Sequence, residues 1–129
     1  MNRKEIALDC RDKKYNCAQS VLCAFAADVG LEKDTALKIS ACFGGGMRCG
    51  EVCGAVTGIL MAIGMKHGSA AENDEAGKYP AYKKTAEYIN RFKEIHGTLL
   101  CRELLKTGGK AICEKAILNA VEIGEELIL

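Results

Sequence analysis

The sequence predicts an all-α fold, a compact bundle of about five to seven helices. No stretch alternates apolar and polar residues as a half-buried strand does; instead, apolar residues recur at helical spacing between turn signals. The chain has 129 residues, no tryptophan and few other aromatics, so aliphatic residues and cysteine must fill its core. This length predicts a single domain over residues 1–129, and it buries enough surface that no disulfide is needed for folding.

Each of the first three expected helices begins at a side chain that can accept hydrogen bonds from free backbone N–H groups. Asn2 and Asn16 each stand three residues before a Glu or Gln, which is the spacing of a capping box. Gly30 is placed to end the second helix, and Asp34 to cap the third. These helices are expected over residues 2–12, 17–28 and 35–43.

Glycine and proline set the limits of the later helices. The three glycines at 44–46 break the third helix and predict a loop, and Pro80 suits the first turn of the fifth. Gly97 ends that helix, Thr98 caps a short one, and the glycines at 108–109 separate it from the last. The later helices are expected over about 52–66, 80–96, 99–106 and from 110 almost to the C-terminus. One face of the fifth helix is expected to carry Tyr82, Ala86, Ile89 and Phe92. One face of the last helix is expected to carry Ile112, Ala116, Ala120, Ile123 and Leu127.

Charge and hydropathy exclude several classes of protein. The net charge is +1 with both signs interspersed, which argues against a nucleic-acid-binding surface. The N-terminal segment is charged and lacks the apolar core of a signal peptide. The apolar run over 52–65 is shorter than the ~20 residues that span a bilayer. We therefore expect a cytoplasmic protein, in which clustered cysteines more often bind metal or react than form structural disulfides.

The eight cysteines carry the functional signal. None forms a CxxC pair, which argues against a zinc ribbon, a ferredoxin-type run and a thioredoxin-like site. Four of them fall at expected helix N-termini, where free N–H groups and the helix dipole favour a thiolate: Cys17, Cys53, Cys101 and Cys113. We expect these four to converge at one end of the bundle as metal ligands or redox-active thiols, and the pKa of Cys53 to lie below its usual value.

The other cysteines are assigned smaller roles. Three lack the help of a helix N-terminus and are expected to fill the core: Cys10, Cys23 and Cys42. Cys49 lies one helical turn before Cys53 in the glycine-rich loop, where it could be a fifth ligand or a resolving thiol. Gly50, Gly54 and Gly58 are the positions at which a cofactor could approach the backbone, although close helix packing is the preferred interpretation of Gly54 and Gly58.

The combination of motifs resembles the C-GCAxxG-C-C family of redox-active proteins, which is marked by four cysteines and a CGAxxG motif. The matching segments are residues 16–20 (NCAQS), 43–47 (FGGGM), 53–58 (CGAVTG), 101–104 (CREL) and Cys113. The resemblance implies that Cys17, Cys53, Cys101 and Cys113 are the functional set. It also implies redox activity and a functional link to a transporter, and it supplies no substrate.

Three functions are consistent with this cysteine pattern, and the sequence leaves open whether the protein is an enzyme. Four thiolates could bind an iron–sulfur cluster or another soft metal for electron transfer or redox sensing. The same cysteines could form dithiol pairs of a thiol/disulfide oxidoreductase that needs no cofactor, or a structural zinc site with four cysteine ligands. The expected partners are a redox protein and a second copy of the chain.

Overall fold

The computed structural model describes all of residues 1–129 and contains six α-helices and no sheet, which confirms the predicted all-α fold. The helices are α1 (Arg3–Asp12), α2 (Cys17–Phe25), α3 (Lys33–Ile39), α4 (Gly54–His67), α5 (Glu75–His96) and α6 (Cys101–Ile128). Two short helical turns, η1 (Ala41–Phe43) and η2 (Gly46–Gly50), connect α3 to α4.

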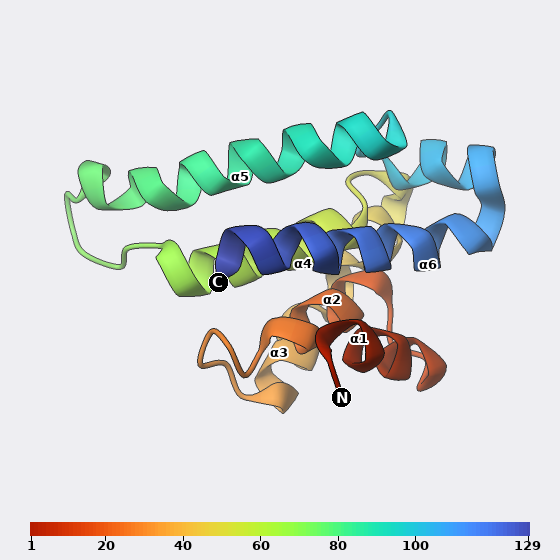
Figure 1. Ribbon diagram of the computed structural model, residues 1–129, viewed down its shortest axis with the longest axis horizontal. Coiled ribbons are helices and arrows are strands. Elements are labelled where there is room, and N and C mark those ends of the chain that lie inside the picture. Colours follow the sequence, from red (N-terminus) through yellow and green to blue (C-terminus); the bar gives the residue numbers. More distant parts are fainter.

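The helices lie in three tiers (Figure 1). The long helix α5 covers one side, α4 and α6 form the middle tier, and α1, α2 and α3 lie on the opposite side. Helix α4 contacts α2, α5 and α6, so it is the central element of the bundle. One continuous cluster of buried residues draws on all six α-helices, and α3 contributes only Ala36 to it.

Small residues allow α2 and α4 to pack closely. A β-carbon at Gly54 would lie 2.7 Å from the Ala18 nitrogen, and one at Gly58 would lie 2.8 Å from the Ala18 carbonyl oxygen. Both distances are shorter than a β-carbon tolerates, so the approach of the two helices requires glycine at both positions. The preferred interpretation of these glycines, helix packing, is therefore confirmed.

Helix α5 buries only part of the face expected for it. Phe92 is buried and Ile89 packs against the core as expected, whereas Tyr82 is 63% exposed. The other buried residues of α5 are Ala81 and Tyr88. The Tyr88 hydroxyl donates a hydrogen bond of 2.9 Å to the Ala55 carbonyl oxygen on α4, which satisfies the polar end of a fully buried side chain. The apolar stripe of the last helix is confirmed from Ala116 to Leu127.

Several helix limits differ from the expected ones, and local hydrogen bonds explain the differences. Helix α2 ends at Phe25, and α3 begins at Lys33 because the side chain of Glu32 caps it. Helix α5 begins before Pro80, at Glu75, because the Asp74 carboxylate accepts a hydrogen bond from the Gly77 N–H. In α6, the φ of +59° at Gly109 produces a kink that divides the helix where the glycines predicted a break.

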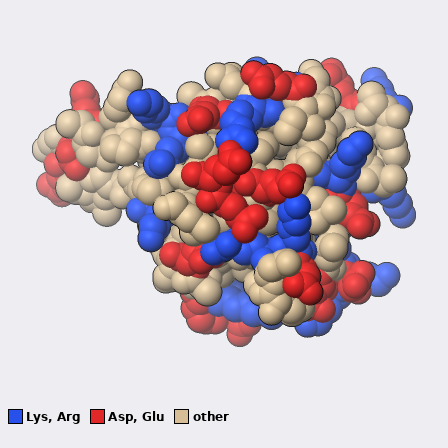
Figure 2. Space-filling view, in the orientation of Figure 1, with Lys and Arg blue, Asp and Glu red and all other residues tan.

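Charges of both signs are interspersed on the surface seen in Figure 2. Arg3 joins three parts of the fold: its guanidinium donates to Asp28 at 2.8 Å and to Glu125 on α6 at 2.9 Å. The pKa of the Asp28 carboxyl is lowered chiefly by its hydrogen bond with Arg3. None of the helices has the length and apolar character needed to cross a membrane.

Candidate functional site

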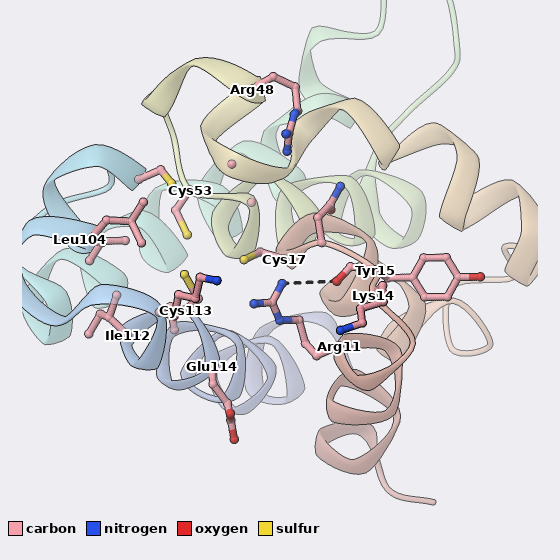
Figure 3. A pocket seen from close by; sticks show the side chains of 17 residues that line it. Arg11, Lys14, Tyr15, Cys17, Arg48, Cys53, Leu104, Ile112, Cys113 and Glu114 are labelled. Atoms are coloured by element: carbon pink, nitrogen blue, oxygen red, sulfur yellow. Dashed lines mark hydrogen bonds between the residues drawn. The ribbon is translucent and has the colours of Figure 1, made fainter.

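Cys17, Cys53, Cys101 and Cys113 line a single cavity of about 680 Å³, near the kink of α6. In Figure 3, the sulfurs of Cys17, Cys53 and Cys113 point toward a common space. Cys17 and Cys53 are buried, while Cys101 and Cys113 are half-buried, and all four are free thiols. The structure thus brings together the four cysteines that the sequence singled out, from segments spread over most of the chain.

Each of these cysteines stands at or near the start of a helix. Cys17 is the first residue of α2, Cys101 is the first residue of α6, and Cys53 is the N-cap of α4. Cys113 lies in the turn that follows the kink at Gly109, where the second half of α6 begins. The glycine at 109 therefore gives the long helix a second N-terminal end beside the cavity.

A short backbone pairing fixes Cys53 beside Cys101. Val52 and Leu100 form an isolated antiparallel bridge. Across it, the Cys53 N–H donates to the Leu99 carbonyl, and the Cys101 N–H donates to the Glu51 carbonyl, both at an N···O distance of 2.7 Å. These two bonds hold the starts of α4 and α6 together, so the positions of both cysteines depend on backbone contacts that no helical pattern predicts.

The glycine-rich segment between α3 and α4 is left-handed over four successive residues. Gly45, Gly46, Met47 and Arg48 have φ values of 65°, 64°, 58° and 63°. For the two residues that carry a β-carbon, this conformation costs on the order of 1–2 kcal/mol each. The segment is held despite that cost because the Glu51 N–H donates to the Gly46 carbonyl at 2.9 Å.

The same segment packs against the starts of two cysteine-bearing helices. A β-carbon at Gly44 would overlap the side chain of Asn16, and one at Gly46 would lie 2.8 Å from the β-carbon of Cys101. The Asn16 side chain caps α2 and also donates to the Ala41 carbonyl at 2.8 Å. The strained loop is therefore part of the wall that places Cys17 and Cys101.

Cys113 and Cys17 differ in the proton affinity of their thiols. The neighbouring Cys17 thiol and, to a smaller extent, the charge of Arg11 lower the pKa of Cys113 to about 6 against the opposing effect of burial. The interaction with Cys113, together with burial, raises the pKa of Cys17 far above its usual value. Of the two thiols, Cys113 is therefore the one that ionises first.

The expected low pKa of Cys53 is wrong. Burial raises the pKa of its thiol to about 11, although the backbone N–H groups of Ala55 and Val56 act in the opposite direction. Burial also raises the pKa of Cys101, and the nearby charge of Arg48 opposes that shift. The helix N-terminus does favour the thiolate of Cys53, as expected, but the loss of solvation on burial outweighs it.

The remaining cysteines lie outside the cavity. Cys49, expected as a fifth neighbour, is exposed, and its thiol donates to the Gly46 carbonyl at 3.5 Å. Cys10 and Cys23 are buried together with Leu37 in a small second core, whereas Cys42 is exposed instead of buried as expected. Of the three candidate glycines, Gly54 lines the cavity, while α2 fills the space beside Gly58 and the Arg102 side chain lies beside Gly50.

Basic side chains, which no motif in the sequence indicated, surround the four thiols. The cavity is lined by Arg11, Lys14, Arg48 and Lys110, and by one carboxylate, Glu114. Each of the four cations precedes a cavity cysteine by only a few residues, or lies in the glycine-rich loop, and this proximity in sequence was the available signal. A net charge of +1 conceals the cluster because the remaining charges of the chain offset it.

A metal site of the kind expected from the sequence would need the four thiols to form a ligand cage. Four cysteine sulfurs are a suitable donor set for zinc or an iron–sulfur cluster. However, no group of three or more cysteine, histidine or carboxylate side chains is arranged so that it could hold a metal ion. The thiols share a cavity without forming a ligand cage, so the geometry as it stands does not fit a closed metal centre.

Comparison with known proteins gives one result that covers most of the chain. No curated protein and no solved structure is significantly similar to it. A family model described as "Putative redox-active protein (C_GCAxxG_C_C)" matches residues 15–127. These residues include the four cavity cysteines, the glycine-rich loop and the CGAVTG segment. The chain therefore belongs to the C_GCAxxG_C_C family.

Proposed function

We propose that the cavity is the site of a thiol/disulfide oxidoreductase, in which Cys113 is the nucleophile and Cys17 is the resolving thiol. The observation that supports this most directly is that the two thiols line the same cavity, where the neighbouring Cys17 thiol and the charge of Arg11 lower the pKa of Cys113 to about 6. A thiolate attacks disulfides and a thiol does not, so a cysteine that is ionised at neutral pH is the natural attacking group.

The reaction proceeds in two exchanges. The Cys113 thiolate attacks one sulfur of a substrate disulfide, a mixed disulfide forms, and half of the substrate leaves as a thiolate. Cys17 then loses its proton to the leaving group or to water and attacks the Cys113 sulfur. The second half of the substrate is released, and a Cys17–Cys113 disulfide remains. The substrate disulfide gains two electrons, which the two cysteines lose.

The change of charge on Cys113 prepares Cys17 for the second step. While Cys113 is a thiolate, its interaction with Cys17 holds the proton on Cys17. Once Cys113 is part of a mixed disulfide, that charge is gone. The positive charge of Arg11, which lowers the pKa of Cys17, then acts with less opposition. Cys53 and Cys101, whose pKa values are raised, are not nucleophiles in this scheme.

The test is to trap the mixed disulfide. Reduced protein is mixed with oxidised glutathione at pH 7, quenched with acid, and mapped by peptide mass spectrometry. Wild-type protein should yield a Cys17–Cys113 disulfide. Cys17→Ala should instead accumulate glutathione on Cys113, because no thiol resolves the adduct. A wild-type disulfide that joins other cysteines, or a Cys17→Ala variant with no adduct on Cys113, would refute the proposal.

Cys10→Ala is the matched control for the loss of a buried thiol. Cys10 is as well buried as Cys17 and lies in the second small core, outside the cavity. This variant should give the same Cys17–Cys113 disulfide as wild-type protein. If Cys10→Ala also trapped glutathione on Cys113, trapping would reflect a general loss of packing and would not identify the resolving thiol.

An iron–sulfur cluster or zinc held by the four cavity cysteines is the second candidate. It is favoured by the convergence of four thiols and four cations on one cavity, because the cations would offset the charge of an anionic centre. The four sulfurs would have to move closer together than they lie in this structure. Anaerobic purification with metal and acid-labile sulfide analysis and a visible spectrum tests it. Stoichiometric metal that is lost on replacement of any of the four cysteines would support it over the dithiol scheme.

A further inference from the structure

We infer that the substrate of the cavity is a small disulfide that carries anionic groups, and that Arg48 is a residue that binds them. That the substrate is a disulfide rests on the proposed thiol chemistry. That it is anionic is supported separately by the positive charge of the cavity wall, the absence of ion pairs among its cations, and the backbone conformation that places Arg48.

The cavity is more positive than the protein as a whole. Its lining contains four cations against the single carboxylate of Glu114, while the chain carries a net charge of only +1. Negative charges are therefore placed elsewhere on the surface. A concave wall of one sign concentrates ligands of the opposite sign, and a thiolate on Cys113 would leave part of the positive charge uncompensated.

None of the four cations has a carboxylate partner. The structure contains six ion pairs within 4.0 Å, and none of them uses a cavity cation; their cations are Arg3 (twice), Lys4, Lys13, Arg91 and Arg102. In the cavity, Arg11 donates only to the Tyr15 carbonyl at 3.3 Å, and Arg48 donates only to the Gly44 carbonyl at 3.4 Å. Most of the donors of both guanidinium groups are therefore free to bind a carboxylate or a similar anion.

The conformation of the loop gives Arg48 a specific position. Arg48 adopts a left-handed conformation that residues with a β-carbon rarely take, and the hydrogen bonds of Gly46 and Glu51 hold the loop there. In Figure 3, the Arg48 guanidinium points into the space between the loop and the end of α1, across the cavity from Cys113. Strained backbone of this kind persists only where the surrounding structure holds it in place, and such residues cluster at binding sites.

The size of the cavity argues for a small molecule. Pockets of about 300–1,000 Å³ enclose most of the surface of a small ligand, and this one measures about 680 Å³. Apolar side chains of Leu104 and Ile112 complete the wall beside the thiols. The site therefore suits a compact disulfide with carboxylates at its ends, whose sulfurs reach Cys113 while its anionic groups reach Arg48.

The experiment compares two disulfides that differ in charge alone: dithiodiglycolate, which carries two carboxylates, and its neutral diamide. Reaction at Cys113 is followed by peptide mass spectrometry. Each rate is divided by the rate at which 2-mercaptoethanol reacts with the same disulfide, and the corrected ratio is that of the dicarboxylate to the diamide. We expect this ratio to increase about threefold for each cation that acts, and to fall toward one as salt is raised to 0.5 M. Arg48→Gln should lower the ratio, whereas Arg91→Gln, the same charge change outside the cavity, should not.

A binding measurement separates this inference from the thiol chemistry. Cys113→Ser cannot form the mixed disulfide, so calorimetric titration of this variant measures binding without reaction. It should bind dithiodiglycolate more tightly than the diamide, and the additional change Arg48→Gln should reduce that difference. Equal binding of the two compounds, or a corrected rate ratio near one in wild-type protein, would overturn the preference for anions even if Cys17 and Cys113 proved to be the redox pair.

Discussion

Replacement of Cys17 by alanine should raise the pKa of Cys113. In the intact pair, the Cys17 thiol is placed to donate to the Cys113 thiolate, and this interaction is the largest cause of the lowered pKa of Cys113, about 6. A hydrogen bond to a charged group contributes about 1.5–3 kcal/mol, and one pKa unit corresponds to about 1.4 kcal/mol. Loss of the donor should therefore move the midpoint of Cys113 ionisation by about one to two units, to about pH 7–8.

The midpoint is a better readout than the rate at a single pH. The thiolate fraction at pH 7 should fall from about nine-tenths to between a half and a tenth. A thiolate of higher pKa is also a stronger nucleophile, with a Brønsted slope of about 0.4–0.5, and this gain offsets much of the loss. The rate at pH 7 should therefore change little, while the plateau rate at high pH should rise about threefold to tenfold.

The assay is alkylation by iodoacetamide between pH 5 and 10, with Cys113 resolved from the other cysteines by peptide mass spectrometry. Cys17→Ser is the matched control, because its hydroxyl keeps a donor at the same place and should hold the midpoint near that of wild-type protein. Far-UV circular dichroism checks that both variants are folded. A wild-type midpoint at or above the value of about 8.5 for a free thiol, or a midpoint that does not move in Cys17→Ala, would refute the reasoning.

Two further predictions concern the packing that supports the site, and each has a control on the same helix. Gly54→Ala should lower the free energy of unfolding by about 1–3 kcal/mol, because the new β-carbon would lie 2.7 Å from the Ala18 nitrogen. Gly64→Ala places its β-carbon where nothing lies within 4 Å, so this variant should raise the free energy of unfolding by about 0.5–1 kcal/mol. Tyr88→Phe should lower it by about 1 kcal/mol, because a buried hydroxyl loses its bond to α4, whereas the exposed Tyr82→Phe should be neutral. Urea unfolding measures all four, and equal effects within either pair would contradict the packing argument.

Much of the helical architecture could be predicted because its signals are local. The capping boxes at Asn2 and Asn16 involve residues three apart and are present in the structure as expected. The break at Gly109 depends on one residue with a positive φ. The start of α5 was misplaced because Pro80 is compatible with an early helical turn but does not require one, and the cap at Asp74 decided the limit.

The convergence of the four cysteines could be expected from their positions at helix starts, but its detail could not. The contacts that fix it join residues far apart in sequence, such as the bonds between the segments around Val52 and Leu100. The pKa of Cys53 shows the same limit, because the sequence indicates a helix N-terminus and says nothing of the burial that outweighs it. Local pattern therefore predicted which four cysteines line one cavity and failed to predict the directions of their pKa shifts.

The division of roles among the four thiols follows from their surroundings and not from their helix positions. All four stand at or near a helix start, yet only Cys113 combines a thiol donor and a nearby arginine with partial exposure. Cys53 has the helix N-terminus without the donor and is buried, and its pKa moves in the opposite direction. A helix dipole contributes about 0.3–1 kcal/mol at exposed positions, which is less than one pKa unit. The interaction with the Cys17 thiol is the largest cause of the lowered pKa of Cys113, so the partner thiol, and not the helix dipole, distinguishes Cys113 from the other three cysteines.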